Sequence, residues 1–333
     1  MAVIALQHRF ARNVARLSGL LAACALPLQA RAELRVETSW QASSVLLQYV
    51  EFAPDGALLV TADGGGVGQL WRTDGQSVAV LKGQRAPMFR AHFSGDGQQL
   101  ITSGYDGSGV VWSRSGQRLQ RLQLHRAATA DVFLLPPTPT ATAALVSGSD
   151  DGTVVLRNRE GELLWSAQFS GTTRQLRPNA SATLIAASSD NGQIHLVTPA
   201  ADRRSATVRS FQTPHGRINL LRFSPDQRQL AAAGTDGTVS LSALNGTLQR
   251  SLKVTDVGWA RGMSFCGATP QASLLTVGDD GTLRQWSPQG HMLASLSLSP
   301  KVPLTAVDCS VNGRQAAVVN AAGRLWMLAV SAP

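Results

Sequence analysis

The sequence FSGDGQQLITSGYDGSGVVWSRSGQRLQRLQ, residues 93–123, decides the fold. It contains turns at Asp96-Gly97, Asp106-Gly107 and Ser115-Gly116, and short apolar runs lie between them. Asp-Gly turns suit β-hairpins because their central residues adopt positive φ at little cost. Short runs bounded by such turns are typical of single β-strands. The segment therefore predicts consecutive strands joined by tight antiparallel turns.

The same pattern recurs along the chain with a period of roughly 43 residues. Successive copies of the middle turn are 41, 45, 40, 45, 44 and 42 residues apart. The seven turns are Gly65-Gly66, Asp106-Gly107, Asp151-Gly152, Asn191-Gly192, Asp236-Gly237, Asp280-Gly281 and Ala322-Gly323. Most copies have a further turn before this hairpin and another after it, so each unit contains four short strands. A fixed period of this length indicates a repeat protein whose neighbouring units bury one another's faces.

The repeated pattern, FSPDG…L…T…DGTV…W…G…L…L, resembles that of the WD-repeat β-propellers over residues 33–330. The resemblance implies an all-β fold, a seven-bladed β-propeller of four-stranded antiparallel blades. The chain departs from the family because no Trp-Asp pair is present. No copy keeps the family's full hydrogen-bonded set of His, Ser or Thr, Asp and Trp. The third and fifth copies carry His without Trp, and the first, second and sixth carry Trp without His.

The two ends of the repeat region complement each other. The seventh copy stops after its third strand, at residues 325–330, whereas residues 33–40, ELRVETSW, form a spare strand before the first copy. In propellers of this family the N-terminal segment completes the last blade, and such closure removes two exposed sheet edges. We therefore expect one domain, residues 33–333, in which the N-terminal strand closes the last blade.

Residues 1–32 have the features of a secretory signal peptide cleaved after Ala32. They contain four Arg and no acidic residue, an apolar run over residues 17–28, and the sequence Ala30-Arg31-Ala32. Such a leader predicts export to a bacterial periplasm or the extracellular space. The alternatives are a membrane-anchored lipoprotein with a lipidated Cys24, a mitochondrial presequence, or an uncleaved segment. Apart from such an anchor, no stretch is long and apolar enough to predict a membrane span.

The net positive charge of the chain does not indicate nucleic-acid binding. The formal net charge of the whole sequence is +9, and the four arginines of the leader account for much of it. No catalytic or metal motif is recognisable, because the histidines lack metal-ligand spacing and no Cys-x-x-Cys occurs. The Asp residues at the turns are explained by turn capping. We therefore expect no nucleic-acid partner, no enzymatic activity, no metal and no cofactor.

Cys266 and Cys309 are expected to remain unpaired. They lie at the inner-strand ends of adjacent blades but one position apart in register. Successive side chains of a strand point to opposite faces, so the two thiols are expected on opposite faces. A disulfide requires Cβ atoms that point toward each other.

We expect a monomer that acts as an interaction scaffold and binds a protein partner, of unknown identity, through its end loops. The loops leading into the inner strands and the Asp-Gly turns share one end of the ring, and several carry Arg or aromatic side chains, the types that dominate interface energy. The candidate partner-binding residues are Tyr105, Arg126, Arg217, Trp259 and Arg261, with Arg85 and Lys301 in equivalent loops. The candidate channel-lining residues are Glu51, Arg90, Arg222 and Asp308, whose opposite charges could also pair with one another.

Two alternatives to a simple scaffold remain. The segment DGTVVLRNREGELLW, which ends at Trp165, also resembles a strand of the quinoprotein-like propellers, which include an envelope-assembly lipoprotein. It carries no pyrroloquinoline ligand set. An enzyme or sugar-binding propeller would instead use carboxylates gathered at the channel. Glu51, Asp131 and Asp308 are expected to be scattered, which disfavours that alternative.

Overall fold

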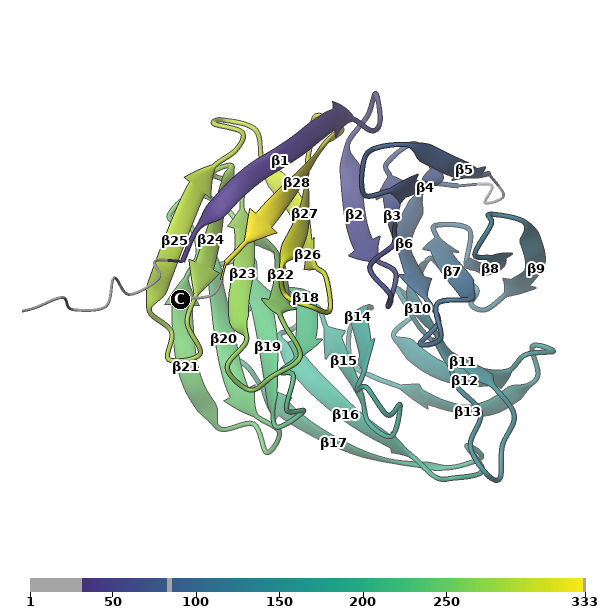
Figure 1. Ribbon diagram of the computed structural model, residues 1–333. Coiled ribbons are helices and arrows are strands. Elements are labelled where there is room, and N and C mark those ends of the chain that lie inside the picture. Colours follow the sequence, from purple (N-terminus) through teal and green to yellow (C-terminus); the bar gives the residue numbers. More distant parts are fainter. Residues whose placement is uncertain (1–31, 83–85, 332–333) are drawn as a thin grey trace, which may run out of the picture. The chain divides into compact units, whose positions relative to one another are not determined.

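The computed structural model describes residues 32–82 and 86–331 as one compact unit. Residues 1–31, which include Cys24, and Arg85 lie outside the described residues. Every regular element in the described range is a β-strand, and the 28 strands form seven four-stranded antiparallel sheets (Figure 1). No helix in this range is long and apolar enough to cross a membrane. The predicted all-β, seven-bladed propeller is confirmed.

The first three blades follow the chain in order. Blade 1 consists of β2 (Leu47–Phe52), β3 (Leu58–Asp63), β4 (Gly68–Arg72) and β5 (Ser77–Leu81). Blade 2 consists of β6 (Met88–Phe93), β7 (Gln99–Gly104), β8 (Ser108–Ser113) and β9 (Arg118–Gln123). Blade 3 consists of β10 (Thr129–Leu135), β11 (Ala144–Ser149), β12 (Thr153–Asn158) and β13 (Leu163–Gln168).

The remaining blades continue the same order. Blade 4 consists of β14 (Thr173–Pro178), β15 (Ile185–Ser189), β16 (Gln193–Pro199) and β17 (Ala206–Gln212). Blade 5 consists of β18 (Ile218–Phe223), β19 (Gln229–Gly234), β20 (Thr238–Ala243) and β21 (Leu248–Lys253). Blade 6 consists of β22 (Ala260–Cys266), β23 (Ser273–Gly278), β24 (Thr282–Trp286) and β25 (Met292–Ser297). Blade 7 consists of β26 (Leu304–Cys309), β27 (Gln315–Asn320), β28 (Arg324–Val330) and β1 (Leu34–Gln41).

The first strand of each blade lies at the centre of the ring. β2, β6, β10, β14, β18, β22 and β26 each contact the next in this order, and β26 contacts β2 again. The hydrophobic cores lie between blades, because alternate side chains of a strand point to opposite faces. Leu274 of β23 packs against blade 5, for example, whereas its neighbour Leu275 packs against blade 7. Each blade is therefore buried on both faces by its two neighbours.

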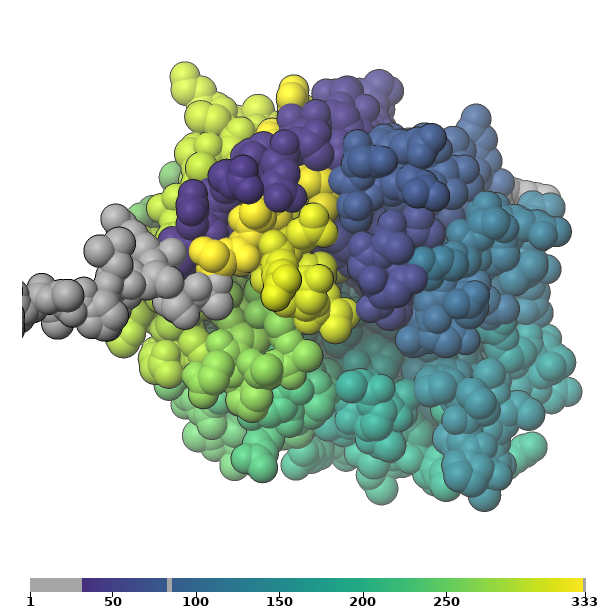
Figure 2. Space-filling model, viewed as in Figure 1, coloured from purple at the N-terminus to yellow at the C-terminus, as the bar shows by residue number. Residues whose placement is uncertain are grey.

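The ring closes through the two ends of the described chain. β1 pairs with β28 in antiparallel register from Leu34 opposite Val330 to Gln41 opposite Arg324, with one irregularity between Val36 and Thr38. The last sheet therefore has the order β1-β28-β27-β26. Figure 2 shows the purple N-terminal strand lying against the yellow C-terminal segment. The expected completion of the last blade by residues 33–40 is confirmed.

Two different kinds of buried side-chain hydrogen bond stabilise the blades. In blades 1, 2 and 6 a Trp indole N–H donates to a Thr hydroxyl on the neighbouring strand, from Trp71 to Thr61 (3.0 Å), Trp112 to Thr102 (3.1 Å) and Trp286 to Thr276 (2.7 Å). In blades 3 and 5 a buried His contacts a Ser of the blade, with His125 2.8 Å from Ser147 and His215 2.9 Å from Ser240. Each of these five blades thus keeps one part of the family's hydrogen-bonded set, either the Trp–Thr pair or the His–Ser pair.

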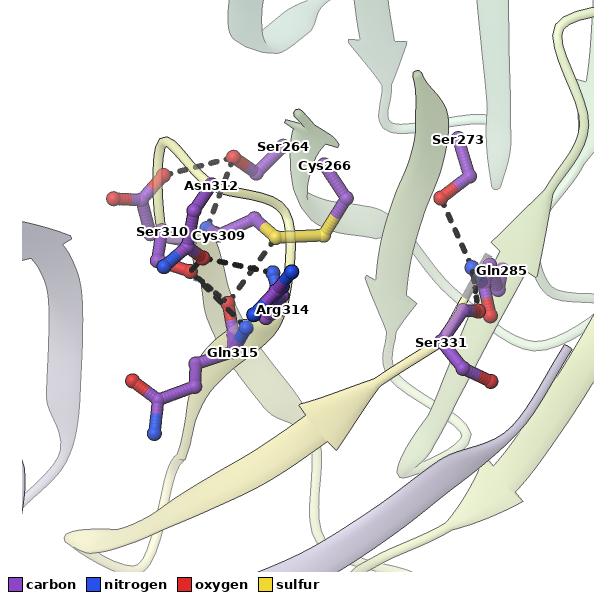
Figure 3. Close-up of a disulfide and its surroundings, with 11 residues drawn as sticks. Ser264, Cys266, Ser273, Gln285, Cys309, Ser310, Asn312, Arg314, Gln315 and Ser331 are labelled. Atoms are coloured by element: carbon purple, nitrogen blue, oxygen red, sulfur yellow. Dashed lines mark hydrogen bonds between the residues drawn. A yellow bond between two sulfur atoms is a disulfide. The ribbon is translucent and has the colours of Figure 1, made fainter. Parts of the chain in front are cut away.

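The expectation that Cys266 and Cys309 stay unpaired is wrong. The two residues form a disulfide with a Cα–Cα distance of 5.2 Å (Figure 3). They do lie on opposite faces of their strands, but adjacent blades stack face to face. The face of blade 6 that carries Cys266 therefore meets the opposite face of blade 7, which carries Cys309. A one-position offset in register is what brings the two thiols together across the blade interface.

Removal of this disulfide should destabilise the protein. It closes a loop with a sequence separation of 43 residues, so the Cys266→Ala, Cys309→Ala double variant should lose about 2–4 kcal/mol in urea unfolding. Cys266→Ala alone should lose nearly as much, because either change breaks the bond. Alkylation of both thiols in the native protein before reduction would contradict the assignment.

Deletion of β1 should destabilise the ring far more than a surface change does. The deletion exposes the edge of β28 and removes Trp40, whose ring centroid lies 5.8 Å from that of Trp71. We expect a loss of more than about 3 kcal/mol in the free energy of unfolding. Arg35→Gln on the same strand, where the side chain is 66% exposed, should change it by less than about 0.5 kcal/mol. An unchanged melting transition in the deletion variant would show that β1 does not close the ring.

Candidate functional site

The inner strands carry polar side chains at two levels along the ring axis. All seven begin at the same face of the ring, because each blade repeats the same strand order. We call this the start face: the loops leading into the inner strands and the turns between the second and third strands of each blade. Residues at the beginnings of the inner strands line a pocket. Glu51, His92 and Arg177, further along these strands, form a buried charge cluster together with Tyr49 and Asp131. The two sites adjoin each other, since the pocket residue Arg90 lies over the ring of Tyr49, which belongs to the cluster.

The pocket at the start face has a volume of about 210 Å³ and is dominated by arginine. It is lined by Gln48, Phe89, Arg90, Ala130, Arg174, Gln175, Arg217, Ile218, Asn219 and Arg261. Three of its four arginines were singled out from the sequence, Arg217 and Arg261 as loop residues and Arg90 as a channel residue. Arg174 was missed, although it stands at the start of β14 just as Arg261 stands at the start of β22.

The four arginines differ in how their charge is balanced. Arg174 pairs with Asp150 at 3.2 Å, and Arg261 pairs with Asp279 at 2.6 Å. Among the described residues, Arg90 and Arg217 have no acidic partner within 4.0 Å, and their Nε atoms are buried without a hydrogen-bond partner. The pocket therefore contains two uncompensated guanidinium groups.

Aromatic rings lie against three of these arginines. The guanidinium carbon of Arg90 lies 5.0 Å from the centroid of the Tyr49 ring. Those of Arg217 and Arg261 lie 5.8 and 4.2 Å from the Trp259 ring, within the range of cation–π attraction. Trp259 thus orders two arginines from adjacent blades and does not itself line the pocket.

The start face also exposes apolar side chains around this pocket. Tyr105 is 51% exposed and stacks on the pocket residue Phe89 with the ring centroids 4.0 Å apart. Val257, in the loop before β22, is 67% exposed, and Val45 and Leu46 are exposed in the loop before β2. Arg126 and Lys301 are exposed in the loops before β10 and β26 but do not line the pocket.

The charge cluster lies further along the inner strands and is centred on His92. Its Nδ1 is 2.8 Å from Glu51 Oε2, and its Nε2 is 2.8 Å from Asp131 Oδ1. The Tyr49 hydroxyl donates to the same Glu51 oxygen at 2.7 Å, and Arg177 lies 3.8 Å from it. Sequence reasoning treated Glu51 and Asp131 as scattered, which is wrong: the ring brings them to one histidine.

The carboxylates of the cluster also accept hydrogen bonds from backbone N–H groups at the inner edges of the blades. Glu51 accepts a hydrogen bond from Phe93 N (3.0 Å), Asp131 from Leu176 N (3.1 Å) and Asp308 from Phe52 N (2.8 Å). In each case the donor belongs to the inner strand of the next blade. An inner strand has no further strand to pair with, so these side chains replace the missing backbone acceptors.

The other predicted channel residues are placed differently. Arg222 is buried and donates to the backbone oxygen of Leu221 at 3.0 Å. Among the described residues, neither Arg222 nor Arg90 forms an ion pair within 4.0 Å with Glu51 or Asp308. The missed residues His92 and Arg177 occupy the inner-strand position that Glu51, Arg222 and Asp308 occupy in their own blades. Alignment of the inner strands by their terminal Phe would have pointed to His92, which precedes Phe93 as Glu51 precedes Phe52. β14 ends at Pro178 instead of Phe, so the sequence offered no such signal for Arg177.

The environment shifts the pKa values of the cluster in opposite directions. Burial alone would raise the pKa of Glu51, but His92, Arg177 and the Tyr49 hydroxyl outweigh it and lower the pKa to about 2. Burial and the nearby Glu51 charge raise the pKa of Asp308. Burial, followed by the charge of Glu51, raises the pKa of Tyr49. Glu51 is therefore ionised at neutral pH, and the Tyr49 hydroxyl remains a hydrogen-bond donor.

No group of three or more His, Cys, Asp or Glu side chains is arranged to hold a metal ion within residues 32–82 and 86–331. The cluster joins opposite charges and hydrogen-bonded backbone groups, as a structural network does. The start-face pocket, in contrast, contains two arginines, Arg90 and Arg217, that have no acidic partner within 4.0 Å among the described residues, so it is the stronger candidate for binding an external group.

Comparisons with known proteins agree with the architecture. The family model described as "WD domain, G-beta repeat" matches residues 75–113 and 206–241. The chain is similar to the WD repeat-containing protein slr1409 of Synechocystis sp., with 37% identity over 231 residues, 69% of this chain and 68% of the relative. It is also similar to the uncharacterized WD repeat-containing protein slr1410 of the same organism, with 38% identity over 241 residues, 71% of this chain and 70% of the relative.

The charge cluster should make stability depend on pH through Glu51. In the unfolded chain Glu51 takes up its proton near its ordinary pKa of 4.5, whereas in the folded protein it stays ionised to about pH 2. Stability present above pH 4.5 is therefore lost as the pH falls toward 2. The stability deficit of Glu51→Gln at about pH 6 should shrink by on the order of 2 kcal/mol by about pH 3.

Urea unfolding of both proteins across this pH range checks the expectation. Tyr49→Phe removes one of the hydrogen bonds that lower the Glu51 pKa, so this variant should show part of the same pH effect. A stability difference between wild type and Glu51→Gln that stays constant from about pH 6 to about pH 3 would contradict the assignment.

Proposed function

Because this chain belongs to the WD-repeat family of β-propeller proteins, we propose that it is an exported scaffold that binds a partner protein through its start face. A WD-repeat propeller is suited to protein interaction, since its rigid ring presents many loops on one surface. The observation that supports the start face is the gathering of the arginine-lined pocket and exposed apolar side chains in one place. Arginine and aromatic residues supply most of the energy of protein interfaces.

The proposal of export rests on the leader-like composition of residues 1–32 and is supported by the disulfide. Disulfides persist in oxidising compartments and are rare in the cytosol. The Cys266–Cys309 bond lies across a blade interface and both residues are nearly buried, which fits a structural rather than a redox-active disulfide. We propose that the mature protein is a monomer in a bacterial periplasm or outside the cell, with a lipid anchor at Cys24 as the alternative.

A second candidate function, an enzyme or a sugar-binding protein that uses the channel, draws on the convergence of Glu51, His92 and Asp131. Acid–base chemistry needs carboxylates that can reach a substrate. Here the carboxylate oxygens are already hydrogen-bonded to His92, to Tyr49 or to backbone N–H groups, and His92 and Asp131 are buried. We therefore place this function second and propose a binding role without catalysis.

Capture experiments with matched surface variants test the start face. The Tyr105→Ala, Val257→Ala variant removes exposed apolar contacts from this face, whereas Leu119→Ala, Val311→Ala removes comparable side chains from β9 and from the opposite face. Partners retained from envelope extracts by the immobilised wild type should fall at least about tenfold on the first variant and stay unchanged on the second. Equal retention by both variants, or no protein enriched over a blank matrix, would contradict the proposed function.

A further inference from the structure

The pocket at the start face contains positive charge that the protein does not neutralise. Of its four arginines, Arg174 and Arg261 are paired with Asp150 and Asp279. The described residues supply no such partner within 4.0 Å to Arg90 or Arg217. Both side chains line the same cavity although they come from blades 2 and 5. The ring thus brings two unpaired guanidinium groups from different blades to one small space.

The guanidinium groups of Arg90 and Arg217 are preorganised to donate hydrogen bonds to an acceptor. Their Nε atoms are buried and have no hydrogen-bond partner, which is a costly state for a charged donor. Arg90 stands on β6 over the Tyr49 ring, and Arg217 stands directly before β18 within reach of the Trp259 ring. Side chains positioned before binding lose less conformational entropy when a ligand arrives.

The size and surroundings of the pocket indicate what would enter it. Its volume of about 210 Å³ is smaller than the roughly 300–1,000 Å³ of pockets that hold whole small molecules. It has room for one or a few side chains instead. The surface around it exposes Tyr105, Val257, Val45 and Leu46, which an inorganic ion would leave uncovered but a polypeptide would bury.

We propose that this pocket receives carboxylate side chains of an acidic segment of the partner protein, an inference that rests on the proposed function of the start face. The planar guanidinium group binds a carboxylate through two parallel hydrogen bonds, which a lysine cannot reproduce. Glu or Asp side chains of the partner enter between Arg90 and Arg217, and its apolar side chains cover the exposed residues around the rim. The uncompensated charge also attracts the acidic segment from a distance at low ionic strength.

Fluorescence anisotropy with two labelled peptides tests this inference. One peptide alternates Glu and Leu, and the other has Gln in place of every Glu. The Glu peptide should bind the full protein at least about tenfold more tightly in about 20 mM salt, and the preference should fall to about twofold or less in about 500 mM salt. Equal binding of the two peptides would overturn the inference.

Matched charge variants separate the pocket from general attraction. Arg90→Gln, Arg217→Gln should abolish the preference for the Glu peptide. Arg118→Gln, Arg209→Gln removes the same charge from exposed outer strands and should keep the preference within about twofold. A loss of equal size in both variants would mean non-specific attraction and would overturn the inference. Arg90→Lys, Arg217→Lys keeps the charge without the bidentate geometry, so it should retain only part of the preference even if the Gln variant folds poorly.

The outcomes distinguish this inference from the proposed function. If the Glu peptide shows no preference but the Tyr105→Ala, Val257→Ala variant still loses captured partners, the start face remains the binding surface and the acidic chemistry is wrong. If captured partners are unaffected by that variant while the Glu peptide binds through Arg90 and Arg217, the pocket is an anion site independent of the proposed interface. Inorganic phosphate at about 10 mM provides the last comparison. If it displaces the Glu peptide completely, and the Tyr105→Ala, Val257→Ala variant binds the Glu peptide as tightly as the wild type does, a free anion rather than a polypeptide is the occupant.

Discussion

The fold depends on the burial of both faces of every blade. A four-stranded sheet of this length cannot hide its apolar side chains on its own, and here each hydrophobic core lies between two sheets rather than within one. Any open end of such an arrangement would expose an entire apolar face. The pairing of β1 with β28 removes that end, so strands from the two ends of the propeller complete a single blade.

Closure leaves backbone N–H and C=O groups without strand partners at the centre of the ring, where the seven inner strands face one another. Side chains supply missing acceptors, since Glu51, Asp131 and Asp308 each accept a hydrogen bond from an N–H of the next blade. Basic and aromatic groups around His92 then balance these carboxylates. These carboxylates, His92 and Arg177 are thus explained by structure, whereas Arg222 is buried without an ion pair among the described residues. Arg90 and Arg217 differ from Arg222 because they line a pocket at the start face, where a ligand can reach them.

The repeat made much of this architecture predictable. Periodic turns specify the hairpins, and the surplus strand at residues 33–40 matches the strand missing at the other end. Features that join different blades were harder to foresee. The Cys266–Cys309 disulfide and the meeting of Glu51 with Asp131 both depend on how one blade faces the next, which the pattern within a single repeat does not contain. Arg174 was missed although it occupies the same strand position as Arg261, and its place in the pocket is evident only in the closed ring.

Native-state hydrogen exchange of the β1 amides tests ring closure most directly. Amides within β1 that bond to β28 should be protected to a degree comparable with those of β26 and β27, since all four strands belong to one cooperative sheet. Exchange of the β1 amides at the rate of open loops, while β26 to β28 remain protected, would contradict closure by the N-terminal strand.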